Sequence, residues 1–159
     1  MGLLFNPAEV FQIAVRIEVN GEKFYREMAK KLDDPEVVSL FSYLADEEIG
    51  HREFYEALLS QIESVEPEED YPGEYFDYLY SYADGIIFSQ ETFEKRLREI
   101  TDEAGALAFA IGVEWDSIHY YQELKGLVPE SQRQRLNDLI AEERRHFVTL
   151  TRLKKEKNY

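Results

Sequence analysis

The sequence lacks cysteine, is poor in positive charge and contains no long apolar run. The absence of cysteine among its 159 residues excludes disulfides, cysteine-ligated zinc, iron–sulfur clusters and thiol nucleophiles. Its 18 lysines and arginines are outnumbered by 33 aspartates and glutamates, giving a net charge of −15. That balance argues against a nucleic-acid or anionic-membrane surface, because both need cationic patches. Without a membrane-length run or a basic leader, we expect one acidic cytoplasmic domain over residues 1–159.

What the chain does contain is apolar residues at helical spacing. The pattern predicts helices over residues 7–31, from 35 to about 62, over roughly 103–127, and from 130 into the basic C-terminal run. Proline stands at the start of the first two segments, as the first turn of a helix tolerates. No β pattern of comparable length accompanies these segments. The predicted fold class is therefore all-α, a four-helix bundle made of two helical hairpins.

A long acidic connection, residues 65–102, separates the two predicted hairpins. The stretch 63–103 holds 13 acidic and 3 basic residues, a net charge of −10 out of the total of −15. A connection of this length lets the second hairpin run in a direction that a short loop would forbid. It contains a turn-rich start (66–73), an aromatic stretch (75–82), a break at Asp84-Gly85 and a short helical pattern (91–100). We interpret the aromatic stretch as a packing or dimer surface and the acidic residues as solvated.

The two hairpins repeat one arrangement of polar residues. Residues 13–18 match residues 109–114, each ending in glutamate, and a tyrosine follows seven residues later, at Tyr25 and Tyr121. A Glu-x-x-His then stands on the second helix of each hairpin, with its glutamate 30 residues beyond the first glutamate in one half and 29 in the other. All six polar residues continue apolar helix faces, so they are expected to point into the core: Glu18, Glu48, His51, Glu114, Glu143 and His146.

Burying these side chains without partners is expensive, since an unpaired buried carboxylate costs several kcal/mol even after relaxation. Two divalent cations would balance the four negative charges. Residues at i and i+3 lie on one helix face, so the glutamate and histidine of each Glu-x-x-His can share one metal ion. One glutamate from each of two helices and a Glu-x-x-His from each of the other two is the ligand set of carboxylate-bridged di-metal bundles.

With this duplicated ligand set the sequence resembles the ferritin-like superfamily, and within it the rubrerythrin-like branch, over nearly its whole length. The resemblance implies a di-iron centre, with Glu48 and Glu143 as bridging carboxylates and Glu18 and Glu114 as terminal ones. It places His51 and His146 among the ligands and Tyr25 and Tyr121 immediately behind them. Manganese, or a mixed pair with iron, suits the same ligand types.

The chain departs from rubrerythrins in two respects. It has no cysteine-ligated rubredoxin module, so any electron donor must be another protein. The extra carboxylate that rubrerythrins carry one turn after the third-helix ligand is replaced by Ser117, and Asp116 lies on the wrong face. Glu22, one turn after Glu18, is a candidate extra ligand or proton carrier.

The remaining acids and the third histidine are expected to lie outside the site. His119 stands five residues beyond Glu114, about 140° around the helix, so we interpret it as peripheral. Glu47 and Glu142 each precede a predicted ligand and point roughly 100° away from it, towards solvent.

The favoured function is a di-iron oxidoreductase that reacts with hydrogen peroxide or dioxygen, with electrons from an external donor protein and a homodimeric assembly. Tyr25 and Tyr121 would donate hydrogen bonds or supply an electron. Two alternatives remain open: a non-catalytic ferritin-like protein that sequesters or delivers iron, and a metal-free domain whose buried polar groups satisfy one another.

Overall fold

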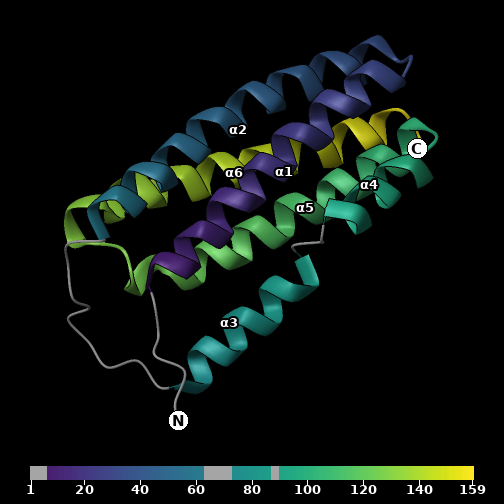
Figure 1. Ribbon diagram of the computed structural model, residues 1–159. Coiled ribbons are helices and arrows are strands. Elements are labelled where there is room, and N and C mark those ends of the chain that lie inside the picture. The colour runs from purple at the N-terminus through teal and green to yellow at the C-terminus, as the bar shows by residue number, and fades with distance from the viewer. Residues whose placement is uncertain (1–6, 63–72, 87–89) are drawn as a thin grey trace.

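The structure, a computed structural model, describes residues 7–62, 73–86 and 90–159. Within these ranges the chain forms six α-helices and one 3-10 turn, without a strand, so the all-α prediction is confirmed. The helices are α1 (Pro7–Lys31), α2 (Pro35–Ile62), α3 (Gly73–Ile86), α4 (Gln90–Glu99), α5 (Glu103–Glu123) and α6 (Glu130–Glu156), with the 3-10 turn η1 (Leu124–Gly126) between the last two. Figure 1 shows α1 packed along α2 and α5 along α6, as two hairpins.

The first hairpin turns at Asp33 and Asp34, where the sequence predicts the break. The Asp34 carboxylate accepts hydrogen bonds from the backbone N–H of Glu36 at 2.9 Å and of Val37 at 3.4 Å, which caps α2. The side chain of Glu103, at the start of α5, accepts from the N–H groups of Asp33 and Asp34 at 3.1 and 3.0 Å. The start of α5 therefore lies against the turn between α1 and α2.

The second hairpin begins at a capped helix and ends beside the same turn. Asp102 accepts a hydrogen bond from the Gly105 N–H at 2.7 Å and so caps α5. The third predicted helix was expected to reach residue 127, but α5 ends at Glu123 and continues as η1. Lys157, directly after α6, forms ion pairs with Asp34 at 3.1 Å and Glu36 at 3.0 Å. Because α5 starts and α6 ends at the α1–α2 turn, α5 runs parallel to α2, as the long connection allows.

The described part of the connection forms α3 and α4. Residues 66–72 of the turn-rich start predicted over 66–73 lie outside the described ranges, and Gly73 begins α3. The aromatic stretch lies in α3, which continues through the expected break at Asp84-Gly85 to Ile86. The short helix predicted over 91–100 is α4, residues 90–99. Tyr82 of α3 donates to the Asp116 carbonyl oxygen at 3.2 Å, and its ring stacks on Tyr120 at 6.4 Å. This tyrosine therefore packs the connection onto α5.

Two apolar clusters fill the bundle, with a polar layer between them. One cluster includes Phe11 and Ala14 of α1 and Leu136 and Leu139 of α6. The other cluster lies at the opposite end of the bundle. Along each of the four central helices, the buried polar residues lie between the residues of the two clusters. No helix in the described ranges is both long and apolar enough to cross a membrane. The fold therefore places carboxylates and imidazoles halfway along a bundle that is otherwise apolar.

Candidate metal centre

All six residues expected to form the site meet in this polar layer. Each is at most 4% exposed, and each of the four central helices contributes at least one of them: Glu18 from α1, Glu48 and His51 from α2, Glu114 from α5, and Glu143 and His146 from α6. Their ligand atoms form two overlapping groups, within each of which these atoms lie within 4.8 Å of one another. One group is Glu18, Glu48, His51 and Glu143, and the other is Glu48, Glu114, Glu143 and His146. Glu48 and Glu143 therefore belong to both groups.

The two histidines present the same ring nitrogen to the shared carboxylates. His51 Nδ1 lies 2.9 Å from Glu143 Oε1 and 3.5 Å from Glu48 Oε2. His146 Nδ1 lies 3.2 Å from the other Glu143 oxygen, Oε2. The two rings are stacked with centroids 5.7 Å apart. Glu143 thus spans the two histidines with one oxygen towards each, as a carboxylate shared by two metal ions must.

The hydrogen bonding of this layer is incomplete in a way that suits metal ions. Among the described residues, His51 Nδ1 and Glu143 Oε1 are buried and make no hydrogen bond, although they are 2.9 Å apart. Buried polar atoms are nearly always satisfied. Imidazole nitrogen and carboxylate oxygen are ligands for iron, manganese and zinc. The donor set therefore fits a pair of divalent cations.

The electrostatics of the layer lead to the same conclusion. Burial and the neighbouring Glu143 raise the pKa of Glu114 to about 8, and burial together with Glu18 and Glu143 raises the pKa of Glu48 well above its usual range. Burial alone would lower the pKa of His146, but Glu114 and Glu143 outweigh it and raise that pKa to about 10. Glu48 and Glu114 therefore hold protons unless a cation replaces them, whereas the two histidines outweigh burial and lower the pKa of Glu143. Protons and metal ions therefore compete for these atoms.

Tyr25 and Tyr121 form a reciprocal pair of hydrogen bonds between the hairpins. The Tyr25 hydroxyl on α1 donates to Glu114 Oε1 on α5, and the Tyr121 hydroxyl on α5 donates to Glu18 Oε1 on α1. Burial and the adjacent carboxylates raise the pKa of both phenols well above 10, so both stay protonated. Each tyrosine therefore orients a carboxylate supplied by the other hairpin.

The expectation that Glu142 points only towards solvent is wrong. Its Oε2 lies 3.0 Å from His51 Nε2, and its Oε1 accepts from Arg135 at 3.1 Å. Glu142 does lie on the flank of α6, as its helical position predicts, but the His51 ring of α2 reaches that flank. A carboxylate on the far nitrogen of a metal-binding histidine fixes the ring and its tautomer. Glu47, the corresponding residue of the first hairpin, instead lies beside Tyr43 and contributes with burial to raising the Tyr43 pKa.

Three further residues are placed as follows. Glu22, the candidate extra ligand, binds Arg52 at 2.6 Å and belongs to neither group of ligand atoms. Ser117 is buried, and its hydroxyl donates to the Val113 carbonyl oxygen at 2.9 Å within α5. His119 is exposed, with its Nε2 2.8 Å from the Tyr78 hydroxyl, so its peripheral position is confirmed.

Two residues at the site carried no functional signal in the sequence. Tyr55, one turn after His51, is fully buried with a hydroxyl that makes no hydrogen bond to the described residues, and its ring lies 4.9 Å from Tyr121. Gly21 lies against Glu48: a Cβ atom at residue 21 would stand 3.3 Å from the Glu48 carboxyl carbon. Glycine there allows α1 to approach the shared carboxylate. Both residues differ from their counterparts in the other half of the repeat, and this difference is the sequence signal that could have found them. Leu150 corresponds to Tyr55, and Ser117 corresponds to Gly21.

Comparison with known proteins agrees with this geometry. The sequence profile of the rubrerythrin family matches residues 9–154. A crystal structure from Thermotoga maritima, described as that of a candidate ferritin-like diiron-carboxylate protein, is 27% identical and superposes with a TM-score of 0.70, covering 96% of this chain and 97% of the other. No curated protein matches the chain.

Proposed function

The chain belongs to the rubrerythrin family, and from that premise we propose that it is a di-iron oxidoreductase that reduces hydrogen peroxide or dioxygen. The proposed ligands are the six buried residues that the structure gathers: Glu18, Glu48, His51, Glu114, Glu143 and His146. Manganese, alone or paired with iron, is compatible with these ligands. The relative in Thermotoga maritima is described as a diiron-carboxylate protein, which supports iron for this chain.

The observation that carries the proposal is the sharing of Glu48 and Glu143 between two groups of ligand atoms. Four buried carboxylates that only served structure would be expected to pair with lysine or arginine. Here the nearest cationic candidates are the two histidines, each itself positioned as a ligand. Two shared carboxylates between two sets of ligands favour two ions held side by side.

Two bound iron ions would supply the electrons that reduce an oxygen–oxygen bond. The protein's own contribution would be to orient the ligands and to hold protons near the bound oxidant. Glu142 orients His51, while Tyr25 and Tyr121 orient Glu114 and Glu18. Reduction of hydrogen peroxide to two waters consumes two protons, and the two tyrosine hydroxyls keep protons at the edge of the cluster. The apolar clusters on both sides exclude bulk water.

Repeated turnover would need a donor that returns electrons to the oxidised ions, and none of the 159 residues is a cysteine that could ligate an iron–sulfur centre for that purpose. We propose an external electron-donor protein and a homodimeric assembly. Both belong to the proposal and neither is needed for metal binding.

The proposal is tested by loading the purified protein anaerobically with ferrous iron and mixing it with hydrogen peroxide or oxygenated buffer. We expect oxidation at least tenfold faster than that of free ferrous ion. Glu48→Gln should abolish the acceleration, because it removes a shared carboxylate, whereas Glu47→Gln, one residue away beside Tyr43, should retain it. Oxidation no faster than in free solution, or equal loss in both variants, would overturn the proposal.

Iron sequestration or delivery is the second candidate, and Ser117 is the observation that favours it. The residue stands where rubrerythrins carry an extra carboxylate, and its hydroxyl is occupied by the backbone of α5. Repeated turnover of peroxide with an added reductant distinguishes the two functions: a sequestering protein oxidises its bound iron once, and an oxidoreductase does so repeatedly. Sizing of the native protein adds a second criterion, since storage requires a large hollow assembly.

A further inference from the structure

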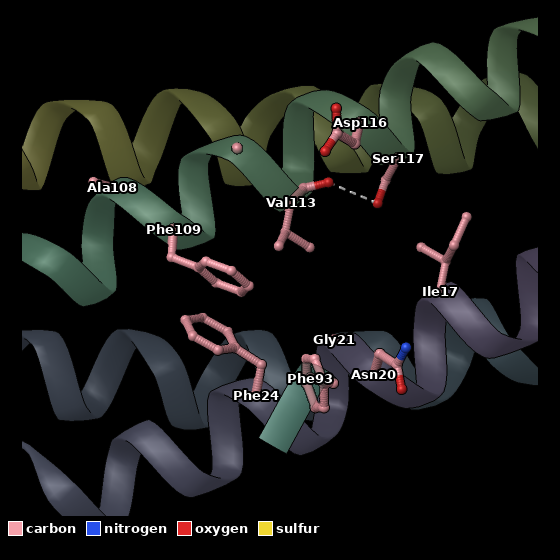
Figure 2. Close-up of a pocket in the computed structure, with 11 residues that line it drawn as sticks. Ile17, Asn20, Gly21, Phe24, Phe93, Ala108, Phe109, Val113, Asp116 and Ser117 are labelled. Carbon is pink, nitrogen blue, oxygen red and sulfur yellow. Dashed lines mark hydrogen bonds between the residues drawn. The ribbon is translucent and has the colours of Figure 1, made fainter. Parts of the chain in front are cut away.

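A cavity of about 280 Å³ lies between α1 and α5, beside the polar layer. Figure 2 shows Phe24 of α1 and Phe109 of α5 side by side at one end of it, with Phe93 of α4 next to them. The rings of Phe24 and Phe109 are 4.8 Å apart at their centroids. Gly112, which is exposed on α5, belongs to the lining as well.

The inner wall of this cavity adjoins the candidate metal centre. Gly21 lines the cavity, and it also lies close to Glu48. A Cβ atom at residue 21 would stand 3.3 Å from the Glu48 carboxyl carbon. Ser117 lines it from the other helix, one turn after Glu114. A molecule in the cavity would therefore lie near the shared carboxylate, although none of the six proposed ligands lines the cavity itself.

The lining favours a neutral, apolar occupant. None of the described lining residues is lysine, arginine or histidine, so no cationic side chain there would attract a phosphate or carboxylate. Asp116 is the one titratable side chain of the lining; it accepts a hydrogen bond from Tyr82 at 3.2 Å, and burial raises its pKa. Aromatic side chains favour aromatic ligands through offset and edge-to-face contacts.

The volume limits the size of the occupant. An engineered apolar cavity of about 150 Å³ binds benzene, which has six carbon atoms. A cavity of about 280 Å³ is nearly twice as large, so it holds roughly ten non-hydrogen atoms, the size of two fused rings.

We propose that this cavity binds a small neutral aromatic molecule of about two fused rings, near the metal centre. The proposal goes beyond reaction with peroxide or dioxygen, for which no organic ligand is needed. It also stands independently of metal binding, because the contacts that carry it are made by Phe24, Phe93 and Phe109. Its failure and the failure of the proposed function are therefore distinguishable.

The chain offers a matched pair of variants for the test. At Gly112 and at Gly50 an added Cβ meets no atom within 4 Å, so both helices accept a side chain there. Gly112→Phe adds a ring at a residue that lines the cavity and should obstruct it, whereas Gly50→Phe makes the same change on α2, outside the cavity lining. Both substitutions leave the six proposed ligands untouched, so the metal content of both variants should equal that of the unsubstituted protein.

Binding is measured with 5-fluoroindole, through its ¹⁹F NMR signal, on the full chain with and without bound metal. We expect saturable binding with a dissociation constant below about 1 mM, weakened at least tenfold by Gly112→Phe and unchanged by Gly50→Phe. No binding at millimolar probe, or binding that Gly112→Phe leaves intact, would overturn the proposal. Self-association that Gly112→Phe abolishes would also overturn it, because the occupant would then be a second copy of the chain.

Discussion

Replacement of Glu142 by glutamine tests how the protein orients a proposed metal ligand. Glu142 holds His51 Nε2 at 3.0 Å with one oxygen and Arg135 at 3.1 Å with the other, and its side chain is 23% exposed. Loss of such a partner typically lowers metal affinity 10- to 100-fold. Glutamine keeps one acceptor oxygen but removes the charge that makes the imidazole more basic. The partial exposure also weakens the effect, so we expect about a tenfold loss, or about 1.4 kcal/mol.

The assay is an equilibrium titration of the metal-stripped protein with Co²⁺, followed by the visible absorption of the bound ion. Glu142→Gln should weaken binding about tenfold and Glu142→Ala about a hundredfold, the upper end of that range, because alanine leaves His51 Nε2 without either oxygen. Glu47→Gln is the control, since Glu47 holds the corresponding place in the other hairpin but lies beside Tyr43. Unchanged affinity in both Glu142 variants, or an equal loss in Glu47→Gln, would refute the argument that Glu142 acts through His51.

Three further predictions follow from the same layer. Tyr25→Phe removes the hydrogen bond to buried Glu114 and should lower the unfolding free energy of the metal-stripped protein by about 1–3 kcal/mol in urea denaturation; unchanged stability would contradict the contact. Gly21→Ala places a methyl group 3.3 Å from the Glu48 carboxyl carbon, so it should weaken Co²⁺ binding, whereas Gly50→Ala should raise the melting temperature and leave binding intact. The pKa of Glu114 is raised from 4.5 to about 8 and that of His146 from 6.5 to about 10, so the folded, metal-stripped protein binds more protons than the unfolded chain. Its melting temperature should therefore fall between pH 6 and 9, while the stabilisation gained from added metal should grow, as calorimetry at each pH would show.

The features that sequence patterns predicted here are local or repeated. The start of α1 and both ends of the α1–α2 turn follow from Pro7, Asp34 and Pro35, whose effects act within a few residues. The six polar residues could be predicted because one set of three, a glutamate and a Glu-x-x-His, occurs twice in the same arrangement on apolar helix faces. Periodicity and duplication can be read without knowing how the hairpins pack.

The features that were missed depend on contacts between the hairpins. His51 and Glu142 are 91 residues apart, and only the packing of α2 against α6 brings them together. Gly85 suggested a break, but glycine costs a helix only about 1 kcal/mol relative to alanine, and α3 continues to Ile86. The cavity combines α1, α4 and α5, so its existence depends on how α4 folds back over the bundle.

The proposed metal centre consists of two metal ions held by six residues of the polar layer. Anomalous diffraction at the iron edge, from crystals of the protein loaded anaerobically with ferrous iron, tests it most directly. We expect two iron peaks per chain, both in contact with Glu48 and Glu143, with one near His51 and the other near His146. A single peak, or iron bound away from this layer, would contradict it.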